Sequence, residues 1–149
     1  MEIIDLVLME AKKAYKKGEV PVGAIIEQNG KIIAKAHNKR EKSQNALHHA
    51  EILAINKACK KLKSWRLNDC TMHVSLEPCL MCAGAILNAR IKNLVIYCKD
   101  EQHGAVLSKY TVLSDGTLNH KTNIELIQNN QAKELITSFF KKLRKNKGL

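Results

Sequence analysis

Two short stretches, His49-Ala50-Glu51 and Pro78-Cys79-Leu80-Met81-Cys82, constrain how this chain can fold more than any other feature of its sequence. Cys79 and Cys82 are three residues apart, so in a helix that begins near Pro78 they share one face. A helix start also favours the thiolate form of cysteine. The stretch around His49 reads as a second helix start. We expect the two helix starts to meet at one end of a sheet and to gather an imidazole and two thiols around one ion.

The number of ligands separates two kinds of zinc site. A structural site is normally closed by four protein ligands, whereas a catalytic site has three and leaves the fourth position for water. His49, Cys79 and Cys82 supply three ligands, and a metal can lower the pKa of water from 15.7 to about 7. Glu51, two residues after His49, can act as a general acid and base within hydrogen-bond reach of such a water. These residues predict hydrolysis by a metal-activated water.

Two other interpretations of the cysteine pair stay open. A Cys-x-x-Cys pair can be a redox dithiol, although that assignment needs a thioredoxin-like context, and nothing else in the sequence suggests one. His48 could also join His49, Cys79 and Cys82 in a closed, purely structural site. Adjacent side chains project in different directions from a helix or a strand, which argues against both histidines reaching one metal.

The pairing of His-x-Glu with Pro-Cys-x-x-Cys is the signature of the zinc-dependent nucleobase deaminases. The chain resembles this cytidine/deoxycytidylate deaminase family over nearly its whole length, and within it the bacterial branch that deaminates adenosine in tRNA. The resemblance is carried by residues 19–24 (EVPVGA), 76–85 (LEPCLMCAGA) and 118–120 (LNH), and by Asn38. It implies the following roles: zinc ligands His49, Cys79 and Cys82, proton carrier Glu51, and substrate contacts Asn38 and Asp100.

The same resemblance implies a three-layer α/β/α cytidine-deaminase-like fold with a mixed five-stranded sheet, assembled as a homodimer. The implied reaction is the hydrolytic deamination of adenosine to inosine at the wobble position, in the anticodon loop of a tRNA. The alternatives are a deaminase of a free nucleobase or nucleoside, such as guanine or cytosine, and a zinc-stabilised RNA-binding module without catalysis. One departure is local: the family usually has Asp-Pro-Thr-Ala before the ligand histidine, and this chain has Asn45-Ala46-Leu47-His48.

Length and composition fit one globular deaminase domain over residues 1–149, with apolar residues making up 45% of the chain. No apolar run is long enough to span a membrane, and the N-terminus lacks a signal-peptide pattern, so we expect a cytoplasmic protein with reduced cysteines. Cys59, Cys70 and Cys98 lie among apolar residues and read as small core side chains.

The charge is strongly positive, with 25 basic against 14 acidic residues and a formal net charge of +11. Such a surplus fits an RNA partner, because neutralised phosphates release counterions, although a lysine-rich solvated surface explains it equally well. Several of the cations follow Phe139-Phe140 near the C-terminus: Lys141, Lys142, Arg144, Lys145 and Lys147. Aromatic residues total only 4%, which argues against a base-stacking platform.

Hydrophobic periodicity predicts alternating helices and strands. Helices are expected at 3–17, at 48–60 with Ile52, Ile55 and Cys59 on one stripe, and from Ala132 to Leu143. Strands are expected at 20–26, 31–36, 71–76, 94–98 and 123–127, with a hairpin turn at Asn29-Gly30 and a loop at 37–45. Trp65 is expected to anchor the core. The long connection 99–122 permits a parallel crossover between the last two strands, which in deaminases of this kind accompanies polymeric or larger substrates.

Overall fold

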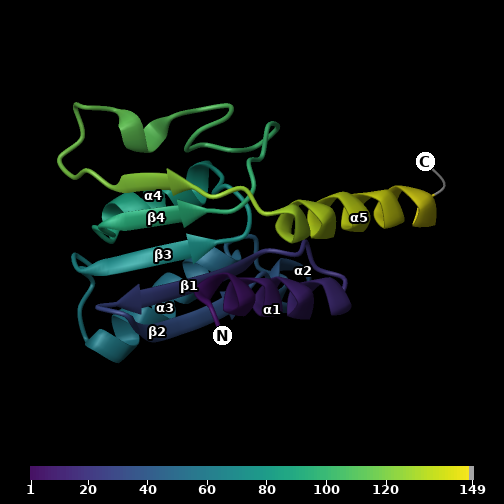
Figure 1. Ribbon diagram of the computed structural model, residues 1–149, viewed down its shortest axis with the longest axis horizontal. Helices are drawn as coiled ribbons and strands as arrows, with labels where there is room; N and C mark the ends of the chain where they lie inside the picture. Colours follow the sequence, from purple (N-terminus) through teal and green to yellow (C-terminus); the bar gives the residue numbers. More distant parts are fainter. Residues whose placement is uncertain (148–149) are drawn as a thin grey trace.

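A mixed five-stranded sheet with helices on both faces forms the centre of the molecule (Figure 1). The computed structural model describes residues 1–147. In spatial order the strands are β2 (Lys31–His37), β1 (Gly23–Gln28), β3 (Cys70–Val74), β4 (Asn93–Ile96) and β5 (Asn123–Leu126). Helices α1 (Ile3–Lys16) and α5 (Asn130–Asn146) lie on one face, and α3 (Ala50–Leu62) and α4 (Leu80–Asn88) lie on the other. The predicted three-layer α/β/α fold is confirmed.

Strand direction places the carboxyl ends of four strands, β2, β3, β4 and β5, at one edge of the sheet. β1 is antiparallel to both β2 and β3, whereas β3, β4 and β5 are parallel to one another. The β1–β2 hairpin turns at Asn29 and Gly30, both with positive φ (51° and 79°), as a tight two-residue turn requires. The connection from β4 to β5 contains the short helix η1 (Val112–Ser114) and returns the chain in the parallel direction, as predicted.

The larger part of the core lies between the sheet and helices α3 and α4. On α3 the fully buried line is Ala50, Ala54 and Ala58, each 0% exposed. Ile52, Ile55 and Cys59, which share one stripe of the helix, are half-buried. Methyl groups fit where the helix meets the sheet closely, and the larger side chains stand at the sides of that contact.

Trp65 is not a core anchor, contrary to the prediction. Its side chain is 56% exposed, and the guanidinium of Arg66 lies 4.5 Å from its ring centroid. Leu67, 1% exposed, fills the buried position in this connection instead. A cation over the face of an exposed indole stabilises the ring at the surface, so its burial is not needed.

The remaining differences concern ends of elements. The first strand begins at Gly23 rather than Val20, because Pro21 has no N–H and the Val22 N–H bonds back to the Val20 carbonyl. The predicted loop 37–45 contains one helical turn, α2 (Arg40–Ser43). Among the cysteines expected in the core, Cys70 is buried, while Cys59 and Cys98 are half-buried at its margins.

The last helix is less buried than its apolar pattern predicts. Of its residues only Ala132 is fully buried, and α5 projects past the edge of the sheet (Figure 1). It is held to α1 by a 2.7 Å hydrogen bond between the Tyr15 and Ser138 hydroxyls and by edge-to-face packing of Tyr15 on Phe139. Among residues 1–147, no helix combines the length and apolarity that crossing a bilayer requires.

Candidate metal centre and substrate pocket

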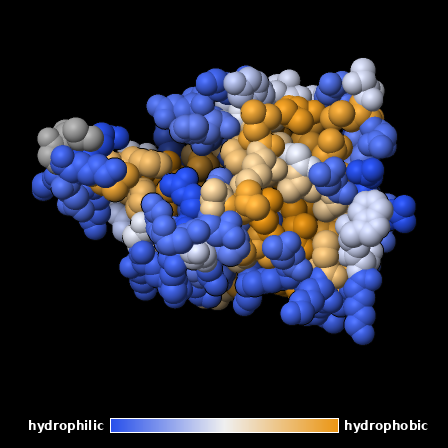
Figure 2. Space-filling model, turned by 180° about the vertical axis from the view of Figure 1, so that it is seen from behind, coloured by the Kyte–Doolittle hydropathy of each residue, from blue (hydrophilic) through white to orange (hydrophobic). Residues whose placement is uncertain are grey.

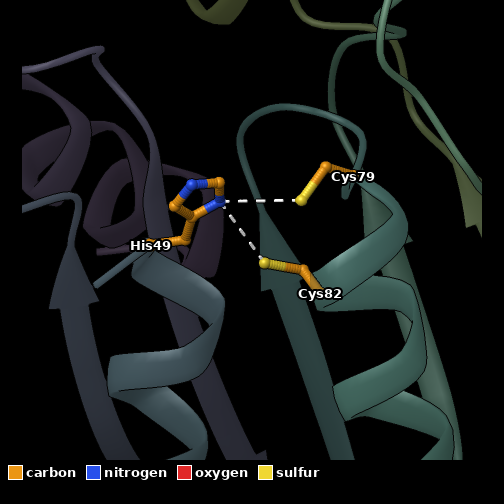
Figure 3. A group of neighbouring side chains, drawn as sticks. All are labelled: His49, Cys79 and Cys82. Atoms are coloured by element: carbon orange, nitrogen blue, oxygen red, sulfur yellow. Dashed lines mark hydrogen bonds between the residues drawn. The ribbon is translucent and has the colours of Figure 1, made fainter. Parts of the chain in front are cut away.

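Two helix starts carry the predicted metal ligands. His49 is the N-cap residue of α3, Cys79 is the N-cap residue of α4, and Cys82 lies in the first turn of α4. The Nδ1 atom of His49 lies 3.6 Å from the Sγ atoms of both cysteines (Figure 3). The three side chains therefore lie together at the sheet edge where β3 and β4 end.

The spacing of these atoms fits zinc. A nitrogen and a sulfur bound to one tetrahedral zinc stand about 3.5–3.6 Å apart, given bond lengths of about 2.0–2.1 and 2.3 Å. The distances of 3.6 Å agree with that separation. In the described part of the chain, His49, Cys79 and Cys82 form the group of side chains able to hold a metal, and His48 is not in it. The closed four-ligand site that includes His48 is therefore not formed.

The protonation of the group follows from its short contacts. Hydrogen bonding from Cys82 and from His49, against the effect of burial, lowers the pKa of Cys79 to about 4. The hydrogen bond to Cys79 in turn raises the pKa of His49. The Cys79 thiolate and burial raise the pKa of Cys82. A thiolate paired with an imidazole is a ready metal-binding set.

Glu51 lies in the first turn of α3, next to this group, and is 4% exposed. Burial raises its pKa to about 7. A carboxyl group with this pKa can both hold and release a proton near neutral pH, which is what general acid–base chemistry requires.

A cavity of about 670 Å³ opens beside the metal ligands. Every site residue predicted from the sequence except Cys82 lines it: Asn38, His49, Glu51, Cys79 and Asp100. Cys82 is fully buried beneath the cavity wall. Side chains separated by more than 60 positions in the sequence are thus brought into one pocket.

The two predicted substrate-binding residues are held by hydrogen bonds to backbone groups. The Asn38 side chain donates to the Val20 carbonyl at 3.3 Å and accepts from the Arg40 N–H at 3.1 Å. The Asp100 Oδ1 atom accepts the N–H groups of Gln102 and His103, each at 3.1 Å. These hydrogen bonds therefore fix the orientation of both side chains.

Several lining residues carry no chemical signature in the sequence. The apolar part of the lining comes from four separate segments: Val20, Val22, Ala50, Leu76, Ile136 and Phe140. Cations also line it: Arg40, Lys99 and Arg144. Of these, only Arg144 belongs to the basic C-terminal cluster described above. The motif EVPVGA could have pointed to Val20 and Val22, but the α5 residues reach the pocket only through the tertiary fold.

Comparison with known proteins agrees with the geometry. A model of the MafB19-like deaminase family matches residues 1–144. The chain is 46% identical to a tRNA-specific adenosine deaminase of Aquifex aeolicus, over 96% of this chain and 95% of that protein. It superposes with a TM-score of 0.85 and 35% identity on a structure from a study of A-to-I editing by tRNA:A34 deaminases at the wobble position, covering 89% and 96% of the two chains. A guanine deaminase of Bacillus subtilis matches with 36% identity and a TM-score of 0.61, over 66% of each chain.

Proposed function

This chain belongs to the MafB19-like deaminase family, and from that premise we propose that it converts adenosine to inosine at the wobble position of a tRNA anticodon. The observation that carries the proposal is a group of three side chains able to hold a metal, next to a pocket that the buried carboxyl group of Glu51 lines. The adenosine in tRNA is chosen as substrate because the similarity to the tRNA-specific enzyme of Aquifex aeolicus extends over 96% of the chain.

His49, Cys79 and Cys82 would hold zinc, since their spacing fits its tetrahedral geometry. When bound, zinc supplies a nucleophilic water near neutral pH, because it can lower the pKa of water to about 7. Two thiolates and a neutral imidazole also balance the charge of the ion.

Glu51 moves the proton. Its carboxylate accepts a proton from the attacking water and delivers it to the 6-amino group of the adenine, which leaves as ammonia while the oxygen stays on C6. Because Glu51 is 4% exposed, bulk water has little access to replace it in this step.

Asn38 and Asp100 would contact the nucleoside from the two loops that border the pocket. The reacting base must be splayed out of the anticodon loop to enter, and a loop that lacks duplex pairing lowers the cost of this step. Arg40, Lys99 and Arg144 come from three different segments of the lining, where they can neutralise neighbouring phosphates. We therefore propose that these cations and the basic end of α5 bind the phosphate backbone of the tRNA around the reacting base.

The apolar surface over α3 and α4 supports a homodimer. Figure 2, which shows the molecule from behind the sheet, displays a broad apolar area on this side. Leu80 on α4 is 54% exposed, and Met81 and Leu87 are half-buried. Patches of this kind on soluble domains mark protein–protein contacts. We also place the protein in the cytoplasm, where tRNA is found and where the metal-binding thiols stay reduced.

A second candidate is a deaminase of a free base, favoured by the similarity to the guanine deaminase of Bacillus subtilis. That similarity covers 66% of this chain, against 89% for the tRNA:A34 deaminase structure, so it is the weaker match.

The deciding experiment incubates zinc-loaded protein with an anticodon stem-loop that carries adenosine at the wobble position. Parallel reactions contain guanine, cytosine and free adenosine. Inosine formed in the stem-loop, and lost when a chelator removes zinc, supports the proposal. Deamination of free guanine or cytosine alone would establish the second candidate. RNA binding with no deamination of any substrate would leave a non-catalytic RNA-binding module.

A further inference from the structure

Glu77 lies in the motif that carries the metal-binding cysteines, yet the proposed chemistry gives it no role. It is a charged residue that is 3% exposed, and it stands two residues before Cys79. Glu77 is therefore a buried carboxylate whose partners must explain its presence.

Those partners all belong to the segment 100–108. One oxygen, Oε1, accepts the Asp100 N–H at 3.1 Å and the Ser108 hydroxyl at 2.5 Å. The other, Oε2, accepts the N–H groups of Val106, Leu107 and Ser108 at 3.1, 2.7 and 2.9 Å. The first and last residues of the segment are thus bound to the same carboxylate. Hydrogen bonds to an ionised acceptor are about twice as strong as those between neutral groups.

The middle of the segment packs directly on this carboxylate. A Cβ atom at Gly104 would lie 2.3 Å from the Glu77 carboxyl carbon and 2.5 Å from the Asp100 carbonyl oxygen, so no larger residue fits. The N–H of Ala105 donates to the Pro78 carbonyl at 2.9 Å. The segment is therefore folded tightly around residues 77–78, immediately before the first cysteine ligand.

This arrangement connects the two halves of the pocket. The segment 100–108 carries Asp100 and His103, which line the pocket, and the strand-to-helix connection at Glu77 leads into Cys79. We propose that Glu77 is a positioning residue whose carboxylate fixes the substrate-binding segment against the metal-binding group. The proposal rests on the proposed function only in that Asp100 is taken to contact the substrate.

Glu77→Gln provides the test. The side chain keeps its size, but one of its two acceptor oxygens becomes an NH₂ donor facing groups that are themselves donors. With an anticodon stem-loop as substrate, we expect KM to rise about 10- to 100-fold, the effect of losing a hydrogen bond to a charged group. We expect kcat to change less and zinc to stay at the wild-type content. A merely structural role would reduce the folded fraction, which lowers the apparent kcat and leaves KM unchanged.

Hydrogen exchange of the substrate-free protein gives a second readout that needs no activity. In Glu77→Gln the amides of residues 100–108 should exchange about 10- to 100-fold faster, while those of β3 and α4 stay protected. Ser108→Ala removes one of the five bonds and should raise KM less, so it serves if Glu77→Gln fails to fold. Glu41→Gln, an exposed control, should match the wild type.

Three results would overturn the proposal. The first is that the amides of residues 100–108 exchange no faster in Glu77→Gln than in the wild type. The second is that these amides exchange faster while KM stays unchanged. The third is that Glu77→Gln loses its zinc together with its activity. If the wild-type protein deaminates no stem-loop, the proposed function fails, and the exchange experiment still decides whether Glu77 holds the segment in place.

Discussion

In Glu51→Gln the buried side chain keeps its size and loses the ability to carry a proton. General acid–base catalysis by a positioned side chain contributes about 10²- to 10⁴-fold to a rate. At about 1.36 kcal/mol for each factor of ten, this corresponds to about 3–5 kcal/mol of the barrier. Because Glu51 is 4% exposed, solvent has little access to take over the proton transfer. We therefore expect kcat to fall to about 1% of the wild-type value or lower.

The assay is single-turnover formation of inosine in a wobble-adenosine stem-loop at saturating enzyme. Zinc content and the thermal unfolding midpoint are measured on the same preparations, and both should stay close to wild type because Glu51 is not among the three metal-ligating residues. Glu41→Gln makes the same chemical change at an exposed position and should keep full activity. A rate for Glu51→Gln above about a tenth of the wild type, with zinc retained, would refute the assignment of the proton carrier.

Three other predictions test packing, charge and assembly. At Gly23 a Cβ atom would lie 2.4 Å from the Val7 carbonyl oxygen of α1, so Gly23→Ala should lower the free energy of unfolding in urea by about 1–3 kcal/mol. Gly116→Ala is the control, because a Cβ atom at Gly116 meets open space, and this substitution should change the free energy of unfolding by less than about 0.5 kcal/mol. Burial lowers the pKa of His37 below its usual 6.5 despite the contact with Glu10, so the unfolded chain takes up this proton first. Stability should fall as the pH drops below about 6.5, and His37→Asn should show a shallower fall in unfolding measured across that range; an unchanged slope would contradict this. Gly84, on α4, has nothing within 4 Å of a built Cβ, so Gly84→Arg should leave the subunit folded and convert the proposed dimer to a monomer in light scattering; an unchanged mass would remove α4 from the interface.

The metal centre could be predicted from the sequence because its geometry is local. A three-residue spacing at a helix start fixes the relation of Cys79 to Cys82, and the sheet has one edge where a second helix start can meet them. The parallel direction of β5 was also predictable, because the connection 99–122 contains 24 residues. A parallel crossover needs a dozen residues or more, whereas a tight hairpin needs only a few.

Features that depend on distant backbone could not be predicted. The donors to Glu77 are mostly N–H groups of a segment more than 20 residues away, and every residue except proline has such a group. Trp65 was misassigned for a related reason, because its exposure depends on Leu67 filling the buried position and on Arg66 covering the ring. The sequence identifies side chains with unusual chemistry, whereas their partners become visible only in the fold.

The direction of β5 has a consequence for how substrate choice could diverge. Because β5 runs parallel to β4, the chain leaves the sheet on the side of the pocket, and α5 contributes Ile136, Phe140 and Arg144 to its lining. The proposed zinc ligands and Glu51 all precede residue 83, while a large share of the entrance follows residue 98. The residues proposed for the reaction chemistry thus all lie in the first part of the chain, while the pocket entrance is shared between that part and the residues after 98. Exchanging the part after residue 98 for that of a related deaminase therefore offers a route to a changed substrate range that leaves the proposed catalytic residues in place.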